Sequence, residues 1–253
     1  MSTRKVSSLK IALSLIGGLG ASAVVAGTMG PVVAPYSFVA TLSGGPVWTN
    51  NAGDTQQFYL APELEKRYVA GKSSETLGEG ELFLGIQHAL NTTVQGQLGL
   101  AVAATSNATL RGVIWDDADP IFDNYTYKYK VQHTHVAVKA KLLADMGYIV
   151  TPWLSGSVGV GFNRAFDYTS TPTIFEAFPT PNFASRTQTT FTYTVGAGIQ
   201  KALTQHWQVG VGYEFADWGK SQLGRSAGQT LNTGLTVDHL YTNGLLFNIT
   251  WLS

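Results

Sequence analysis

The chain carries few groups of side chains whose types and spacing could do chemistry. Asp217 and His239 could supply the acid and the base of a Ser-His-acid triad. Ser221 or Ser226 could supply its hydroxyl, but no nucleophile-elbow motif marks either serine. The sequence also lacks a glycine-rich phosphate loop and a metalloprotease helix motif. We therefore predict that the protein is not an enzyme and has no catalytic residues.

His133 and His135 form the second group. Residues two apart lie on the same face of a strand, so these imidazoles could together contact a transition metal. Two ligands on one strand are too few for a metal site, and no carboxylate lies beside them in the sequence. The lack of cysteine excludes a thiolate metal site, a disulfide framework and a cysteine nucleophile. We expect hydrogen-bonded polar histidines, and we predict no metal and no cofactor.

The composition is poor in charge. Charged residues make up 13% of the 253 positions, about half the ~25% of an ordinary soluble domain. The 16 basic and 16 acidic residues balance to a net charge of zero, so we expect no nucleic acid as partner, because nucleic acid selects basic surfaces. A protein whose outer surface faces lipid fits this composition better than a soluble protein does.

Residues 1–26 have the three parts of a secretory signal. A positively charged start precedes an apolar, glycine-rich run, and small residues then offer cleavage after Ala23 or after Ala26. The apolar run is shorter than the ~20 residues of a spanning helix, which argues against a membrane anchor. We expect export with cleavage of this signal and a mature part covering residues 27–253.

Beyond the signal, the dominant pattern is alternation with a period of two, which is typical of a strand whose faces meet different surroundings. In residues 92–106 the even positions are apolar and the odd positions are polar or small. Further segments repeat this alternation with varying regularity. The eight candidate strands are residues 36–48, 80–90, 92–106, 125–143, 148–166, 186–200, 208–218 and 235–251.

The connections between these strands alternate between short and long. Because the long ones share one end of the fold, they resemble the extracellular loops of an outer-membrane barrel. Residues 57–69, in the first of them, are partly strand-like, and we expect an extracellular hairpin there. The alternative is a ten-stranded barrel, whose lipid-facing wall would carry the charges of this segment. The four long segments are residues 49–79, 111–124, 167–185 and 219–234.

The polar faces of the strands distinguish a membrane barrel from a soluble one. They consist mostly of Gly, Ser, Thr, Gln and Ala, whereas a solvated exterior would be rich in long charged side chains. Small and amide side chains suit a narrow lumen, in which each polar group must find a hydrogen-bond partner. The sequence thus predicts an all-β fold, a transmembrane antiparallel up-and-down β-barrel of about eight strands.

A few charged side chains are predicted to face the lumen: Glu81, Glu214 and Lys139, with Lys141 as a further candidate. We expect them to pair as an interior ion network, because an unpaired charge in a tight lumen is costly. The alternative is a gated ion path. That alternative is disfavoured because the interior of an eight-stranded barrel is just filled by side chains.

In residues 125–143 the apolar side changes along the strand. Tyr127 and Val131 are odd-numbered, whereas the apolar residues from Val136 onward are even-numbered. A β-bulge near the middle would explain the change. We favour a second explanation, in which the first half rises above the membrane, because 19 residues exceed the ~9–11 that a spanning strand needs. The two histidines would then lie near the extracellular rim.

One part of the chain resembles a known family. The sequence Tyr-Glu-Phe-Ala-Asp-Trp-Gly at 213–219, preceded by Val-Gly-Val-Gly at 209–212, is similar to the penultimate-strand pattern of opacity-type outer-membrane proteins. Those proteins belong with the small OmpA-like and OmpX-like β-barrels. Residues 155–162 resemble their glycine-rich mid-barrel strand. The resemblance implies a Gram-negative outer-membrane barrel that the barrel-assembly machinery inserts during biogenesis.

We expect a non-enzymatic surface barrel with a structural or adhesion and host-interaction role. Its extracellular loops would act as the adhesin or surface antigen, because loops on a rigid scaffold are where recognition usually resides. The expected partners are outer-membrane lipid, lipopolysaccharide, the assembly machinery and a surface ligand of unknown identity. A small gated pore and a lipid-modifying outer-membrane enzyme are the alternatives.

Overall fold

The computed structural model describes residues 36–50, 53–72, 74–175, 177 and 181–253. The expected signal, residues 1–26, lies outside these ranges, and its cleavage after Ala23 or Ala26 stays a prediction. The described residues form thirteen strands and one three-residue 3-10 helix. None of their helical structure is long and apolar enough to cross a membrane.

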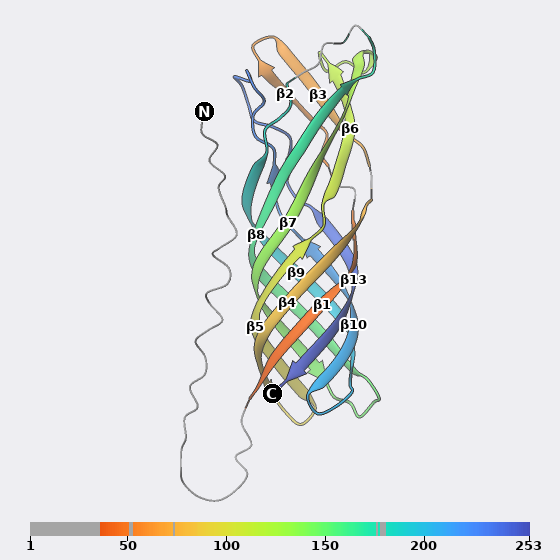
Figure 1. Ribbon diagram of the computed structural model, residues 1–253, viewed down its shortest axis with the longest axis vertical. Helices are drawn as coiled ribbons and strands as arrows, with labels where there is room; N and C mark the ends of the chain where they lie inside the picture. Colours follow the sequence, from red (N-terminus) through yellow and green to blue (C-terminus); the bar gives the residue numbers. More distant parts are fainter. Residues whose placement is uncertain (1–35, 51–52, 73, 176, 178–180) are drawn as a thin grey trace, which may run out of the picture. The chain divides into compact units, whose positions relative to one another are not determined.

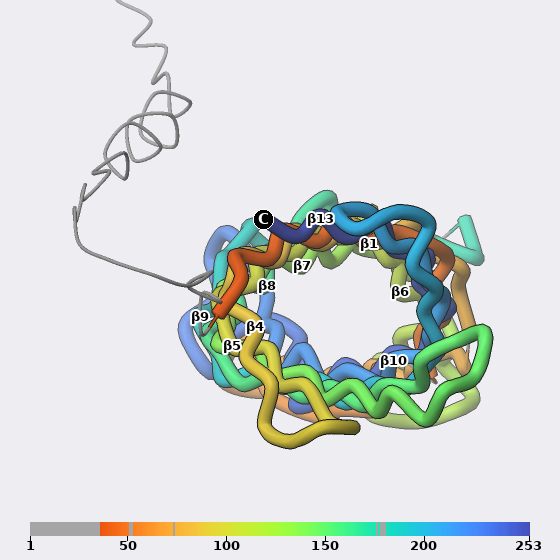
Figure 2. Tube along the Cα trace, turned by 90° about the horizontal axis from the view of Figure 1, so that it is seen from below, coloured from red at the N-terminus to blue at the C-terminus, as the bar shows by residue number. Residues whose placement is uncertain are grey.

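Eight antiparallel strands close into a ring, which Figure 2 shows along its axis. Each strand is hydrogen-bonded to its two neighbours, and pairing of the first strand with the last completes the circle. The predicted fold class and its eight strands are therefore confirmed. In ring order the strands are β1 (Ser37–Thr49), β4 (Thr76–Ala89), β5 (Val94–Thr105), β7 (Asp123–Ala144), β8 (Thr151–Pro172), β9 (Arg186–Ala202), β10 (Trp207–Asp217) and β13 (Tyr241–Leu252).

Three further strands extend the sheet beyond one end of the ring (Figure 1). β2 (Gln56–Ala61) and β3 (Leu64–Ala70) form a hairpin, and β3 pairs with β6 (Ala108–Asp116). β6 in turn pairs with the first half of β7. The segment 57–69 is therefore a hairpin outside the ring, as predicted, and the ten-stranded alternative is wrong.

The connections alternate between short and long, as predicted. The short turns join β4 to β5, β7 to β8 and β9 to β10, and they lie at the end of the barrel where the C-terminus is found (Figure 1). They cover residues 90–93, 145–150 and 203–206. The long connections all lie at the opposite end.

The bounds of the long connections differ from the prediction. β6 occupies the first part of the predicted loop 111–124, and β8 continues to residue 172, beyond the predicted loop start at 167. The last connection runs on to residue 240 and contains the short strands β11 (Ser221–Gln222) and β12 (Thr236–Val237). At β8, strand pairing continues above the membrane-facing part of the barrel, so polarity alone ended that strand too early. The predicted strand 235–251 instead begins too early, because β13 starts only at Tyr241.

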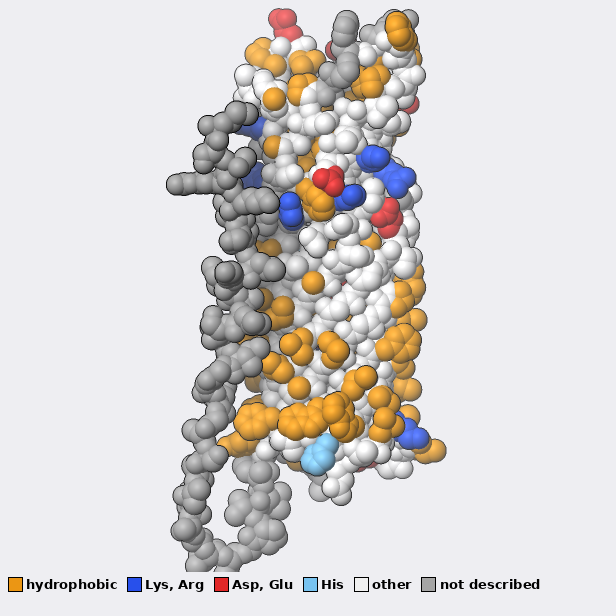
Figure 3. All heavy atoms as spheres, in the orientation of Figure 1, with side chains coloured by type: hydrophobic (Ala, Val, Ile, Leu, Met, Phe, Trp, Pro, Cys, Tyr) orange, Lys and Arg blue, Asp and Glu red, His pale blue; other side chains and the backbone are white. Residues whose placement is uncertain are grey.

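The outer wall of the ring is apolar next to the short turns. In β5 the even-numbered Leu98, Leu100 and Val102 are exposed, whereas the odd-numbered Ala101 and Ala103 are buried. The other ring strands show the same alternation, and Figure 3 shows hydrophobic side chains gathered on this part of the wall. A soluble barrel keeps such side chains inside, so this apolar belt has the arrangement of a wall that faces lipid.

Above the apolar belt the two faces exchange character. The odd residues of β7 face inward along the whole strand. Lys139 faces the lumen at the level of the belt, whereas Tyr127 and Val131 face an apolar core above it. The outer face changes in the opposite sense: the apolar Val138 is exposed at the level of the belt, and the charged Lys128 is exposed farther up the strand. The first half of β7 therefore rises above the belt, as predicted, and the apolar side changes without a shift in strand phase.

A substitution in the apolar belt tests this orientation. Leu100 lies at the middle of β5, opposite Val138 of β7, with its side chain on the outer face. We expect Leu100→Arg to lower the free energy of unfolding in lipid vesicles by about 2–4 kcal/mol, because the charge must enter hydrocarbon. Urea titration followed by tryptophan fluorescence measures this change.

The control is Thr126→Arg, which places the same charge on the exposed outer face of β7 above the belt. We expect its effect to stay within about 0.5 kcal/mol. Equal effects of the two substitutions would contradict a lipid-facing wall.

Candidate functional site

An ion triad occupies the lumen. Nζ of Lys139, on β7, lies 2.7 Å from Oε1 and 2.9 Å from Oε2 of Glu81, on β4. The same Nζ lies 2.9 Å from Oε2 of Glu214, on β10. All three side chains are buried. Because the three strands are not neighbours in the ring, the triad links the wall across its interior, and the predicted ion network is confirmed for these three residues.

A third carboxyl group of the lumen was missed by the sequence analysis. Glu79 lies two residues before Glu81 on β4, faces the same way and is buried. The alternation of β4 could have found it, because its inward positions also include Leu77 and Phe83. The strand predicted from the sequence begins at residue 80, directly after Glu79. The lumen therefore holds more carboxyl groups than the ion triad uses.

Lys141 faces the lumen but does not join the ion triad. Its Nζ donates to Oε1 of Gln200 at 2.7 Å and lies 4.5 Å from the ring centroid of Trp153. Gly198 and Gly212 leave room for that indole, since a Cβ at either position would collide with it. The amide of Gln200 and the indole face of Trp153 thus hold the ammonium group of Lys141. The size of the Trp153 ring explains why glycine occupies the two positions beside it.

A small cavity of about 40 Å³ adjoins the ion triad. Buried polar atoms on its lining lack a hydrogen-bond partner among the described residues: Gln97 Oε1, Trp153 Nε1, Ser155 Oγ and Asn248 Oδ1. A water molecule needs about 10–15 Å³ of such space, so the cavity has room for a few. Water there would satisfy these atoms. The lumen is therefore filled by side chains with space of molecular size between them, and it is not a wide channel.

The two histidines lie inside the barrel, where the lumen meets the region above it. Nε2 of His133 and Nδ1 of His135 are 3.0 Å apart, and Nδ1 of His133 is 2.6 Å from Oδ1 of Asn163. His133 also stacks on the indole of Trp218, with ring centroids 4.7 Å apart. They are hydrogen-bonded polar residues, as predicted, but they are buried and not at an exposed rim. No group of three metal-ligating side chains occurs in the described ranges.

Asp217 and His239 lie together, but no serine completes a triad with them. Nδ1 of His239 is 2.8 Å from Oδ2 of Asp217. The hydroxyl of Ser221 is buried without a partner, and that of Ser226 lies 3.4 Å from Oε1 of Gln229. Within the described part of the chain, neither hydroxyl is hydrogen-bonded to the imidazole. That the protein is not an enzyme stays a prediction.

An apolar cap closes the barrel above the histidines. Side chains of the last long connection turn inward and pack in one cluster with residues of β3, β6, β7 and β8. The polar composition of residues 219–234 predicts a loop there, and residues 235–240 are predicted to begin the last strand, whereas that strand begins only at Tyr241. The inward side chains are Trp218, Leu223, Leu235, Val237 and Leu240, all buried.

Aromatic rings form the other side of the cap. Tyr68 of β3 stacks on Phe58 of β2, with centroids 5.3 Å apart, and meets Tyr127 of β7 edge-on at 5.8 Å. Burial, with smaller contributions from Tyr127 and Asp116, raises the pKa of Tyr68 above its ordinary value. Its hydroxyl therefore stays uncharged at neutral pH, which keeps the interior of the cap free of charge at this point.

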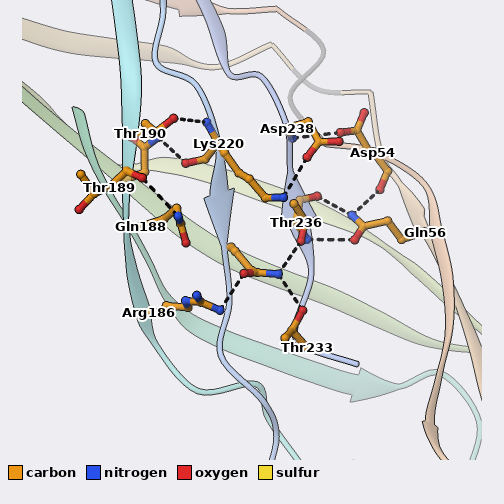
Figure 4. A network of polar contacts seen from close by, with 12 residues as sticks. Asp54, Gln56, Arg186, Gln188, Thr189, Thr190, Lys220, Thr233, Thr236 and Asp238 are labelled. Carbon is orange, nitrogen blue, oxygen red and sulfur yellow. Dashed lines mark hydrogen bonds and ion pairs between the residues drawn. The ribbon is translucent and has the colours of Figure 1, made fainter. Parts of the chain in front are cut away.

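Polar contacts tie the long connections together around the cap (Figure 4). Gln56 of β2 donates to the backbone oxygen of Thr236 in β12 and accepts from its backbone nitrogen. Gln222 of β11 donates to the hydroxyls of Thr233 and Thr236 at 2.7 and 3.0 Å, and accepts from Arg186 of β9 at 2.7 Å. The connections thus form one hydrogen-bonded structure and are not independent loops.

Removal of the central cation tests the ion triad. We expect Lys139→Met to lower the free energy of unfolding by about 3–5 kcal/mol, because it leaves Glu81 and Glu214 buried without a compensating charge. The triple variant Lys139→Met, Glu81→Gln, Glu214→Gln should recover most of this loss. Urea titration in lipid vesicles measures both. If the triple variant were less stable than Lys139→Met, charge compensation would not be the role of Lys139.

No family model matches the sequence, and no curated protein matches it. Among solved structures, the chain is similar to Neisserial surface protein A, with 12% identity over 85% of this chain and 96% of that one, at a TM-score of 0.42. It is also similar to the outer membrane protease OmpT from Escherichia coli, with 9% identity over 87% and 98% of the two chains and a TM-score of 0.47. It is similar as well to the outer membrane protein OprG from Pseudomonas aeruginosa, with 11% identity over 84% of this chain and 95% of that one and a TM-score of 0.42. The fold of this chain, an eight-stranded antiparallel β-barrel of the transmembrane type, rests on its own strand pairings and on the apolar belt of its outer wall.

Proposed function

We propose that the protein is a non-enzymatic surface barrel of the bacterial outer membrane, which contacts a partner outside the cell through the end of the barrel that carries the long connections. The observation that carries this proposal is an apolar tip at the end of the β7–β8 pair. The tip consists of four large apolar side chains that are exposed to solvent: Ile121, Phe122, Ile174 and Phe175.

The membrane location is supported by the apolar belt and by the ends of the ring. Tyr36, Phe38, Tyr148 and Trp207 are exposed near the end with the short turns. Aromatic side chains at this level suit the interface between lipid and water. Short turns on the periplasmic side and long connections outside are the usual arrangement of such barrels. The end of the barrel that holds the cap and the apolar tip then lies outside the cell.

The apolar tip is built from two segments that are held together. Ile121 and Phe122 belong to the 3-10 helix η1 (Pro120–Phe122), and the other two residues directly follow β8. The segments are joined by Thr173, whose backbone nitrogen donates to the Asn124 oxygen at 2.8 Å. Its hydroxyl donates to the Asp123 oxygen at 2.9 Å.

The exposure of this tip supports a role in contact. Ile121 is 84% exposed and Phe175 is 100% exposed. The tip lies at the end of β7 and β8 away from the apolar belt, so outer-membrane lipid does not cover it. Apolar side chains clustered on a surface in water mark an interaction site. We infer that a protein or cell surface with apolar groups of its own covers them, as an adhesin requires.

A pore is the alternative function. The ion triad crosses the lumen, the nearby cavity measures about 40 Å³, and the cap packs apolar side chains above both. An ion on this path would have to break the triad and then enter an apolar core, where an unpaired charge is costly. These features support a barrel that does not conduct in its resting state.

The apolar tip is tested by polar substitution. Ile121→Ser with Phe175→Ser should reduce the adherence of expressing bacteria to a cultured epithelial layer by about fivefold or more, since each buried apolar side chain contributes roughly 1.5–3 kcal/mol to a contact. Colony counts after washing measure adherence. Ile121→Leu with Phe175→Leu keeps the tip apolar and should adhere as the unchanged protein does. Equal adherence of the serine variant would refute a contact made by the tip.

The closed lumen is tested by planar-bilayer recording of the purified barrel. We expect no reproducible unitary conductance, because the ion triad and the cap both obstruct the path. Reproducible conductance steps that change with Glu214→Gln would assign the lumen to ion passage and overturn the closed-barrel proposal.

A further inference from the structure

Two like charges face outward where β6 and β7 pair above the apolar belt. Arg111 of β6 and Lys128 of β7 are directly opposite each other in the register, and both are exposed. Like charges directly opposite each other destabilise a sheet. In the part of the chain that the structure describes, neither side chain has an ion-pair partner. An anion bound between them would remove this repulsion.

A third basic side chain lies on the same outer face. Lys130 follows Lys128 by two residues, and its Nζ is 3.1 Å from Oδ2 of Asp167. Asp167 has a positive φ of 54° at a register shift between β7 and β8. Arg111, Lys128 and Lys130, called the basic patch below, thus carry three positive charges against one negative charge. A second carboxylate, that of Glu75, accepts from the backbone nitrogen of Thr109 beside the patch at 2.6 Å, which leaves a local excess of one positive charge on a protein whose net charge is zero.

The surface is hollowed at the basic patch. One hollow of about 570 Å³ is lined by all three basic residues together with Asp167, Thr109 and Thr169. A second, of about 440 Å³, shares Arg111, Lys128 and Thr169 with the first. These volumes suit a small polar ligand such as a phosphorylated sugar. The threonine hydroxyls add neutral hydrogen-bonding groups beside the charges, as a saccharide would need.

The height of the basic patch indicates where its ligand comes from. Val136 is the last exposed apolar residue of β7, and Lys130 lies six residues farther up the strand. On β8 the exposed Phe162 lies opposite Thr134, four residues below Lys130, so Lys130 stands about 13 Å along the strand, or ~10 Å above the belt for the usual strand tilt. Phospholipid headgroups reach only ~5–8 Å beyond the hydrocarbon. Figure 3 likewise shows Lys and Arg side chains gathered above the belt.

We infer that the basic patch binds a phosphate group on the saccharide headgroup of an outer-leaflet glycolipid, of the chemical class of lipopolysaccharide. The guanidinium of Arg111 can hold a phosphate through two parallel hydrogen bonds, and Lys128 and Lys130 add positive charge beside it. The saccharide extends farther from the hydrocarbon than a phospholipid headgroup does, so its phosphate groups can reach the level of the basic patch. The inference rests on the membrane orientation proposed above, because that orientation brings glycolipid alongside the patch.

Binding of purified lipopolysaccharide to the folded barrel in detergent micelles tests this site. The variant is Arg111→Gln with Lys128→Gln. Its control is Lys201→Gln. This substitution removes an exposed charge from the outer wall at the end of β9 next to the short turns, away from the basic patch. A gel-mobility difference between boiled and unboiled samples confirms that each variant is folded. Lipopolysaccharide dephosphorylated with hydrogen fluoride and inorganic phosphate are the further probes.

We expect the double variant to bind intact lipopolysaccharide about tenfold or more weakly than the unchanged protein, and Lys201→Gln to bind equally well. The dephosphorylated form should bind the unchanged protein as weakly as intact lipopolysaccharide binds the double variant. Raising the salt concentration from about 0.05 to 0.5 M should weaken binding by the unchanged protein.

Equal binding by the double variant and the unchanged protein would overturn the inference. Competition by inorganic phosphate at micromolar concentration would also overturn it, because the ligand would then be free phosphate. Tighter binding of heparin than of lipopolysaccharide would assign the basic patch to a sulfated glycan instead. The assay in micelles does not depend on insertion, so failure of the proposed membrane location would show separately, as absence of the protein from the outer-membrane fraction.

Discussion

Backbone hydrogen bonding is the constraint on which the rest of this structure depends. Lipid offers no partner to an unpaired N–H or C=O group, so a sheet that crosses it must have no open edge. The ladder between β1 and β13 meets this demand by closing the ring, and its register skips only Gly45 and Pro46. Proline has no N–H to donate, so this is a position where a ladder can be interrupted without leaving a donor unpaired. Closure then fixes which side of every strand faces lipid and which faces the lumen.

A ring of eight strands leaves an interior that side chains can fill, and the chemistry of the lumen follows from this narrowness. Polar side chains there have little water to solvate them, so they bond to one another. Lys139 holds two carboxylates at once, and Lys141 takes an amide and an indole face. Above the belt, where water surrounds the outer face, the interior becomes apolar, and Trp218 of the cap stacks directly on His133. The same strands therefore enclose a polar interior at one height and an apolar interior at another.

Much of this could be predicted from the sequence because a period of two is a local signal. The ring strands, the inward direction of Lys139 and the hairpin at 57–69 all follow from alternation and charge. The cap could not be predicted in this way. Leu223 lies in a predicted loop and Leu240 in a predicted ring strand, and the burial of both depends on the fold of the last connection, in which β11 pairs with β12. The burial of the histidines was missed for the same reason, since Asn163 and Trp218 come from other strands of the ring or their ends.

The joined connections have a consequence for immune recognition. Gln56 and Thr236 are 180 residues apart in the sequence yet bond to each other, so neighbouring patches of the outer surface come from distant parts of the chain. An antibody footprint on this surface would combine several segments that exist side by side only in the folded protein. Short synthetic peptides copied from one connection would lack that arrangement, and antibodies raised against them would bind the folded protein poorly.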